Sequence, residues 1–155
     1  MTSDVYERLK ALGVILPLPP RPAGNYASWV CTGKLVVISG QGPFAEGDMV
    51  YRGRVGQDLS VPDAQKAARC AAINLLSHLQ EACGGNLNRV RQLVRLMGGV
   101  CCAPNFYQLP SVLDGASDLL MAVFGEKGRH ARYPVGVLTL PFNAPVTLEL
   151  MAEIE

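Results

Sequence analysis

The chain has 155 residues, of which 49% are apolar and 17% are charged, and its formal net charge is +1. This length suits one domain with a single core. The Lys and Arg residues are scattered and form no basic stripe of the kind that nucleic acids require, so no nucleic-acid partner is expected. The charged fraction lies below the roughly one quarter that is usual in globular domains, and we expect the apolar surplus to lie in a subunit interface.

The N-terminal part of the chain predicts a short helix and an extended arm. Residues 5–12 follow an amphipathic pattern, whereas the Pro-rich residues 16–22 lack amide donors and have restricted φ angles. We therefore divide the chain into an N-terminal helix and arm, 1–22, and one domain, 23–155. The first residues do not resemble a secretory signal, and no apolar stretch approaches roughly 18 residues. A cytoplasmic protein without a membrane partner is expected.

The next segments predict short strands. Residues 29–39 are rich in β-branched and aromatic residues around a turn at Gly33, which is typical of a hairpin or a bulged strand. The hairpin leads to Gly40 and Gly42, which imply a close backbone approach or a positive φ angle. Residues 49–54 fit a further short strand.

Two helices and three strands complete the predicted domain. A long helix is predicted to begin after the N-cap Ser60, with a proline in its first turn, and to end at Gly84 and Gly85. The remaining elements are a strand, a helix and two strands, at residues 90–102, 110–124, 135–140 and 146–154. This order predicts an α+β fold in which two main helices pack on one face of a mixed β-sheet.

The cysteines and glycines point away from metal and cofactor chemistry. The five cysteines are odd in number, lie in apolar surroundings and lack zinc-binding spacings, which favours reduced, buried thiols. Cys101 and Cys102 fit either a reactive pair or plain packing, since adjacent strand residues point to opposite faces. No phosphate-binding or dinucleotide-binding motif is present. We therefore expect neither a metal nor a cofactor.

Two segments carry candidate catalytic side chains. The last predicted strand alternates strictly, so Glu149 points away from the core and is either a solvated side chain or a catalytic carboxylate. Arg132 lies just before another apolar strand, either in a surface loop or as a carboxylate-binding group, because Arg holds carboxylates through two parallel hydrogen bonds. The role of His130 stays open, and His78 fits a packing or surface position on the long helix.

Six different short motifs follow one another along the chain, and the likeness that they carry covers about residue 9 to residue 155. They read Ala-Gly-Asn-Tyr at 23–26, Ile-Ser-Gly-Gln-Gly-Pro at 38–43, His-Ala-Arg at 130–132, Val-Gly-Val at 135–137, Leu-Pro at 140–141 and Val-Thr-Leu-Glu at 146–149. Together they resemble the YjgF/YER057c/UK114 family, also called the reactive intermediate deaminase (RidA) or L-PSP endoribonuclease family. Residues 114–119 and 125–132 are similar to a longer subgroup of that family.

The resemblance implies a chorismate-mutase-like fold, a homotrimer and three clefts between subunits. In such a cleft it implies that Arg132 binds the carboxylate of the substrate and that Glu149 positions or activates water. It also implies that Tyr26 contacts the substrate, that Gly40 lines the pocket and that the backbone carbonyl of Pro134 contacts the substrate nitrogen.

Two positions depart from the family pattern. Many deaminases of the family carry Cys or Ser where this chain has Pro134, so a carbonyl is kept while a thiol or hydroxyl and an amide donor are lost. The position at which family members often have a cleft asparagine falls approximately at Ser117. The shape of the pocket and the range of substrates are therefore open.

The activity that the resemblance implies is the hydrolysis of reactive enamines or imines, 2-imino acids, to 2-keto acids and ammonia. A homotrimer that binds keto acids or other small carboxylates without turnover, as a sensor, is an alternative of another class. A third is the endoribonuclease activity in the family name, against which the lack of a basic stripe and of paired histidines speaks.

Overall fold

The computed structural model describes residues 4–155, in three α-helices and seven β-strands. In chain order these are α1 (Val5–Ala11), β1 (Trp29–Thr32), β2 (Leu35–Gln41), β3 (Phe44–Ala45), β4 (Asp48–Met49), α2 (Val61–Ala82), β5 (Val90–Cys101), α3 (Leu109–Phe124), β6 (Ala131–Val137) and β7 (Val146–Ile154). Short 3₁₀ turns lie at Leu87–Arg89, Gly125–Gly128 and Pro141–Asn143. Of the predicted arm, 1–22, residues 1–3 lie outside this description.

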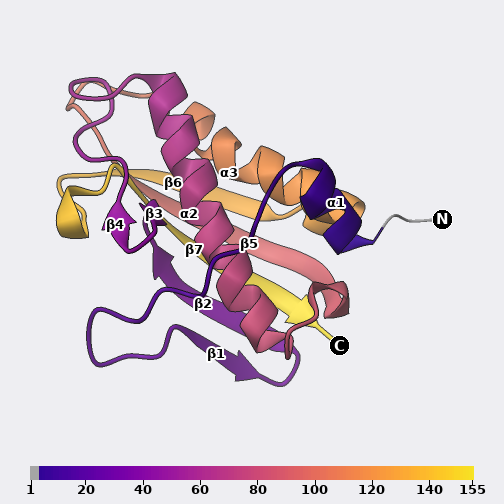
Figure 1. Ribbon diagram of the computed structural model, residues 1–155. Coiled ribbons are helices and arrows are strands. Elements are labelled where there is room, and N and C mark those ends of the chain that lie inside the picture. The colour runs from indigo at the N-terminus through magenta and orange to yellow at the C-terminus, as the bar shows by residue number, and fades with distance from the viewer. Residues whose placement is uncertain (1–3) are drawn as a thin grey trace.

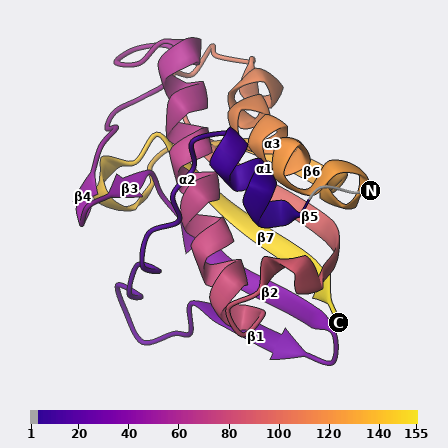
Figure 2. The same ribbon diagram turned by 45° about the vertical axis from the view of Figure 1, so that its right-hand side comes forward.

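Five of the strands form one mixed sheet in the order β1-β2-β7-β5-β6. β5 and β6 run parallel, and the other neighbours are antiparallel. All three helices lie on the same face of this sheet, with α2 and α3 side by side across it (Figures 1 and 2). The predicted α+β class, with two main helices on one face of a mixed sheet, is confirmed. The opposite face is covered by no element of the described chain.

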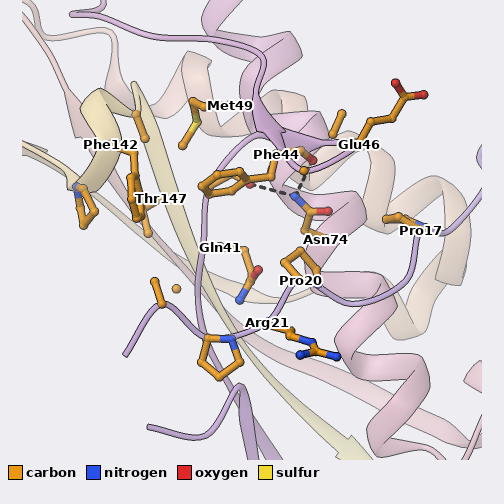
Figure 3. A pocket seen from close by; sticks show the side chains of 18 of the residues that line it. Pro17, Pro20, Arg21, Gln41, Phe44, Glu46, Met49, Asn74, Phe142 and Thr147 are labelled. Carbon is orange, nitrogen blue, oxygen red and sulfur yellow. Dashed lines mark hydrogen bonds between the residues drawn. The ribbon is translucent and has the colours of Figure 1, made fainter. Parts of the chain in front are cut away.

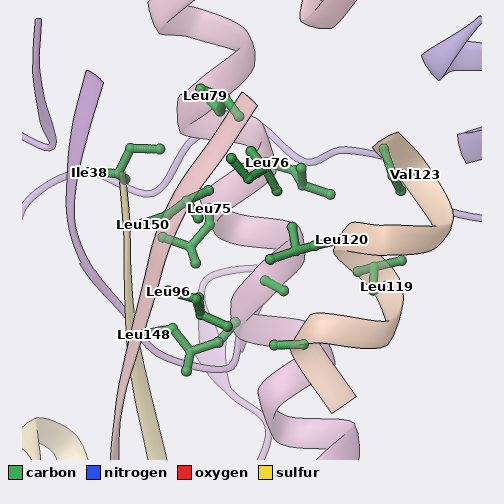
Figure 4. Packing of buried hydrophobic residues seen from close by; sticks show 14 of the residues in the cluster. Ile38, Leu75, Leu76, Leu79, Leu96, Leu119, Leu120, Val123, Leu148 and Leu150 are labelled. Carbon is green, nitrogen blue, oxygen red and sulfur yellow. The ribbon is translucent and has the colours of Figure 1, made fainter. Parts of the chain in front are cut away.

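The core fills the space between the sheet and its two main helices. Leu75 and Leu79 of α2 meet Leu148 and Leu150 of β7 there, and all four side chains are fully buried (Figure 4). The burial of each such side chain contributes about 1.5–3 kcal/mol. The strict alternation of β7 places its apolar residues on this side, as predicted, and its exposed Glu149 on the other.

The ends of α2 follow the predicted signals. The hydroxyl of Ser60 accepts a hydrogen bond from the amide of Asp63 at 3.3 Å, and Pro62 occupies the first turn, where no amide donor is needed. Gly84 and Gly85 follow the helix with φ angles of +66° and +90°, which side chains rarely adopt. The predicted hairpin is also present, since β1 and β2 pair through a turn at Gly33.

The strand predicted at 135–140 is wrong in its bounds, because β6 begins at Ala131. Arg132 therefore lies inside a strand, and the interpretation of a surface loop is wrong as well. Pro134 is accommodated inside β6 because this strand is the edge of the sheet and has a free side that needs no amide donor.

Two smaller predictions need correction. The strand predicted at 49–54 is limited to Asp48–Met49, which pairs with β3, because Gly53 takes a φ angle of +111° that breaks the extended conformation. The thiol of Cys31 is exposed, since β1 is the other edge of the sheet; all five cysteines are free. No helix among residues 4–155 is long and apolar enough to cross a membrane.

Gly115 sets the distance between the two main helices, and its substitution tests this packing. A Cβ atom at this position would lie 2.1 Å from the carbonyl oxygen of Gln65 in α2. We expect Gly115→Ala to lower the stability by about 1–3 kcal/mol or more, because backbone has to move to remove the overlap. Gly99→Ala is the control, since its nearest neighbour lies at 3.5 Å. Equal melting temperatures of the two variants in thermal denaturation would contradict this packing.

Candidate functional site

Neighbouring strands place Arg132 and Glu149 on opposite faces of the sheet. Arg132 pairs with Leu96, which in turn pairs with Leu150, and both leucines are buried under the helices. Glu149 pairs with Met97, and Met97 pairs with Tyr133, which is exposed on the uncovered face. Within one chain the two predicted catalytic residues are therefore not brought together.

Arg132 is the centre of a polar group at the sheet edge, which we call the Arg132 cluster: Asp114, Ser117, His130 and Arg132. Its Nη1 donates to the Asp114 carboxylate at 2.7 Å and to the Ser117 hydroxyl at 3.2 Å, and its Nη2 donates to the Pro110 carbonyl at 3.3 Å. The side chain of Arg132 is 24% exposed and that of Asp114 is 50% exposed. The guanidinium is therefore held from α3 while one side stays open to solvent.

The remaining hydrogens of Arg132 define where an anion fits. A guanidinium has five N–H donors, of which three have partners here. The Nε–H and one hydrogen of Nη2 have no partner within residues 4–155. Neighbouring N–H donors of a guanidinium bind carboxylates. The geometry thus allows carboxylate binding while Asp114 stays in place.

Ser117 and His130 extend the cluster behind Arg132. The Ser117 hydroxyl lies 2.9 Å from Nε2 of His130, and Nδ1 of His130 lies 2.6 Å from the carbonyl oxygen of Gly128. Burial lowers the pKa of His130 below its ordinary value; the Gly128 carbonyl opposes this shift, and the charge of Arg132 adds to it. His130 is therefore neutral at pH 7. Sequence reasoning brought Ser117 into the site but missed both this pairing and Asp114.

Tyr26 and Gly40 lie elsewhere, at a pocket of about 880 Å³ that we call the arm pocket. It is bounded by the Pro-rich arm, the β2–β3 segment and the turn before β7, and its walls are mainly apolar (Figure 3). Phe44 and Phe142 meet there edge to face, with ring centroids 5.8 Å apart. The buried amide of Asn74 donates to the carbonyls of Gly42 and Phe44 and so fixes the pocket floor.

The arm pocket adjoins the uncovered face of the sheet. Thr147 lines the pocket and lies two residues before Glu149, on the same face of β7. A Cβ atom on Gly40 would come within 2.9 Å of the Thr147 methyl group, so the predicted close approach at this glycine is confirmed. One group of predicted site residues, Tyr26, Gly40 and Glu149, thus lies toward the uncovered face. The other group, Ser117, Arg132 and Pro134, lies at the edge formed by α3 and β6.

The described residues form no cluster of side chains that could bind a metal ion. No group of three or more His, Cys, Asp or Glu side chains within residues 4–155 could hold a metal ion. Cys101 is buried and Cys102 is partly buried, and burial is the main cause that raises the pKa of the Cys102 thiol. This environment disfavours the thiolate of Cys102, and the burial of both side chains supports packing rather than reactivity.

His78 is a second buried histidine, on α2. Its side chain is 1% exposed, as the packing alternative expected, and neither ring nitrogen has a hydrogen-bond partner within residues 4–155. Burial lowers the pKa of His78, and the nearby charge of Glu81 opposes the shift in part. A protonated His78 would place a charge in the core that Glu81 compensates only in part.

The two histidines predict a loss of stability in mild acid. Their pKa values are lowered on folding, so the unfolded chain binds more protons. The contribution of the two neutral histidines to the free energy of unfolding is fully present above about pH 6.5, the ordinary histidine pKa. This contribution is lost as the pH falls from there through the lowered pKa values of the folded protein. Denaturant unfolding at constant protein concentration between pH 8 and pH 5 measures this effect. His130→Gln is expected to reduce the drop; a free energy of unfolding that stays constant or rises toward pH 5 would contradict it.

Comparisons with known proteins give a consistent family. Residues 6–154 match the family described as "YjgF/chorismate mutase-like, putative endoribonuclease". The chain is 42% identical to protein TCP17 of Trypanosoma cruzi over 151 residues, which cover 97% of this chain and 94% of that protein.

Solved structures agree with this match. Protein Atu1372 of Agrobacterium tumefaciens, whose function is unknown, superposes with a TM-score of 0.92 at 40% identity, covering 97% of this chain and 92% of its own. RidA from an Antarctic Psychrobacter species superposes with a TM-score of 0.61 at 26% identity, covering 88% of this chain and 94% of its own. The chain therefore belongs to the YjgF/chorismate mutase-like family.

Proposed function

We propose that the protein hydrolyses 2-imino acids, or the enamines in equilibrium with them, to 2-keto acids and ammonia. The observation that carries this proposal is the guanidinium of Arg132, which Asp114 and Ser117 hold through Nη1 while the Nε–H and one hydrogen of Nη2 have no partner in the described chain. A donor fixed in this way loses little freedom when a carboxylate binds. The likeness to RidA supports the same class of substrate.

We further propose a homotrimer whose clefts bring together the two groups of site residues. The uncovered sheet face carries apolar side chains from all five strands: Val30, Val37 and Tyr133 are exposed, and Met97, Val135 and Met151 are half-buried. An apolar face of this kind is typical of an interface between subunits. Because Glu149 lies on that face and Arg132 does not, one subunit would supply Arg132 and its neighbour Glu149.

In the proposed cleft, the neighbour's Glu149 positions the attacking water and its Tyr26 and Gly40 form the wall. The free edge of β6 leaves backbone carbonyls for the substrate nitrogen, and we propose the carbonyl of Pro134 for this contact. An imine is already electrophilic, so orientation accounts for much of the rate that the site has to supply. The five free thiols fit the cytoplasmic location that we propose.

Arg132 is the residue whose loss tests the proposal. Arg132→Ala should reduce kcat/KM for 2-iminobutyrate by about 100-fold or more, because the carboxylate is no longer oriented. Arg129→Ala is the matched control, since its side chain is 69% exposed and pairs only loosely with Glu126 at 3.8 Å. Formation of 2-oxobutyrate and ammonia measures the rate. Unchanged hydrolysis in Arg132→Ala would refute the assignment.

Mixing inactive subunits tests the shared cleft. Glu149→Ala should lower kcat/KM by roughly 100-fold on its own. In trimers assembled from equal amounts of Arg132→Ala and Glu149→Ala chains, roughly a quarter of the clefts contain both native residues, since each cleft draws on two subunits. We expect activity to return to about that fraction. Activity no higher than that of the separate variants would mean that both residues belong to one chain's site.

The two alternatives give different results in the same preparations. A carboxylate-binding trimer without turnover would be stabilised thermally by 2-oxobutyrate through Arg132 and would not accelerate imine hydrolysis. The family description favours a test for ribonuclease activity as well. RNA cleavage that persists through purification and is lost in Arg132→Ala would support that activity in place of the one proposed.

A further inference from the structure

The arm pocket has the size and the walls of a binding site for a small molecule. Its volume of about 880 Å³ lies in the upper part of the range of about 300–1,000 Å³ that is usual for ligand pockets. The apolar walls come from three separate parts of the chain: Phe44 and Met49, Phe142, and the prolines of the arm (Figure 3). The ring of Phe142 is 60% exposed. A flat apolar group in the pocket would cover this ring and remove it from water.

The turn that carries Phe142 has an unusual backbone. Among residues 4–155, the residues other than glycine with a positive φ angle are Glu46, Phe142 and Asn143, at +53°, +60° and +59°. Glu46 and Phe142 line the arm pocket, and Asn143 follows directly. The amide of Gly53 donates to the carbonyl of Asn143 at 3.0 Å and so helps to hold the turn. Bulky residues rarely adopt such φ angles, and those that do cluster at sites that bind ligands.

Gln41 supplies an unused polar group to this apolar pocket. It is only 9% exposed, and its side chain lies among the lining residues (Figure 3). The Ser39 carbonyl can only accept, so Nε2 of Gln41 donates to it at 3.2 Å and the carboxamide is oriented. Oε1 of Gln41 has no partner within residues 4–155, whereas the buried amide of Asn74 already donates to two carbonyls. A ligand with an N–H or O–H group would satisfy Oε1.

The charges of the pocket lie only at its rim. Arg21 and Glu46 are the charged residues of its lining, and both are exposed to solvent. An ionised group between the apolar walls would lose its hydration without gaining an ion pair, which is costly. The part of a ligand that enters the pocket is therefore neutral.

We propose that the arm pocket binds a small aromatic molecule whose ring packs against Phe44 and Phe142 and whose N–H or O–H group donates to Oε1 of Gln41. Indoles and phenols are the simplest molecules of this class. Such binding requires neither Arg132, which lies at the edge formed by α3 and β6, nor imine hydrolysis, so it goes beyond the function proposed above. Tyr26 lines the same pocket, and a bound ligand would thus adjoin the proposed cleft.

Two probes of nearly the same shape test the recognition of the ligand. Indole carries an N–H group, and benzofuran has an ether oxygen in its place. Isothermal titration calorimetry with the native protein measures the Kd of each. We expect indole to bind saturably and about fivefold to 10-fold more tightly than benzofuran, because benzofuran leaves Oε1 of Gln41 without a donor.

Variants locate the binding in the arm pocket. Gln41→Leu removes the acceptor and should weaken indole to about the affinity of benzofuran, while benzofuran stays within about twofold of its native Kd. Phe142→Ala should weaken both probes by about 10-fold or more. Tyr107→Ala is the control, since Tyr107 is 81% exposed and does not line the pocket. Arg132→Ala should bind indole as the native protein does. Circular dichroism and thermal melting identify any variant that does not fold.

Three outcomes would overturn this proposal while leaving the imine hydrolase to its own assay. The site is wrong if neither probe binds the native protein saturably, or if folded Phe142→Ala binds both as tightly as the native protein. Equal affinities of the native protein for indole and benzofuran would exclude the role of Gln41. Indole binding that weakens as the protein concentration rises would mean that a neighbouring chain fills the pocket instead.

Discussion

Successive side chains of a β-strand point to opposite faces of its sheet, and in this protein α2 and α3 cover only one of those faces. The apolar side of β7 belongs to the core, and Glu149 is consequently left on the bare face. Arg132 lies under α3 because β6 pairs in register with β5, which fixes the face of every residue in it. The division of the site into two groups follows from this pairing.

The same geometry gives a reason for a second copy of the chain. A sheet covered on one side exposes apolar side chains such as Val37 and Tyr133 to water, which favours association. In the trimer that we propose, burial of this face would bring Glu149 of one copy toward a neighbour's sheet edge. Stability and the proposed catalysis would then depend on the same contact, so changes at the bare face should affect both.

The Arg132 cluster combines fixation with a readiness to accept protons. Asp114 and Ser117 hold the guanidinium before any ligand arrives, and Asp114 offsets its charge. Burial keeps His130 neutral, so the cluster contains one permanent cation and one base close together. The unpaired donors of Arg132 suit an anionic ligand such as a carboxylate.

Much of the fold was predictable because its signals are local. The cap at Ser60, the glycines after α2 and the alternation of β7 each follow from neighbours in sequence. The start of β6 was not predictable from local signals. A proline such as Pro134 is tolerated only in an edge strand, and whether a strand lies at the edge depends on the whole sheet. The pairing of Ser117 with His130 joins α3 to the start of β6. Resemblance pointed to Arg132, but nothing in the sequence indicated Asp114 as its partner.

A crystal structure of the protein with 2-oxobutyrate tests the central claim most directly. The account predicts a trimer with the carboxylate of the ligand bound by the guanidinium of Arg132 and with Glu149 of the neighbouring subunit facing the ligand. A ligand bound only in the arm pocket, or a trimer in which Glu149 lies far from every Arg132, would contradict it.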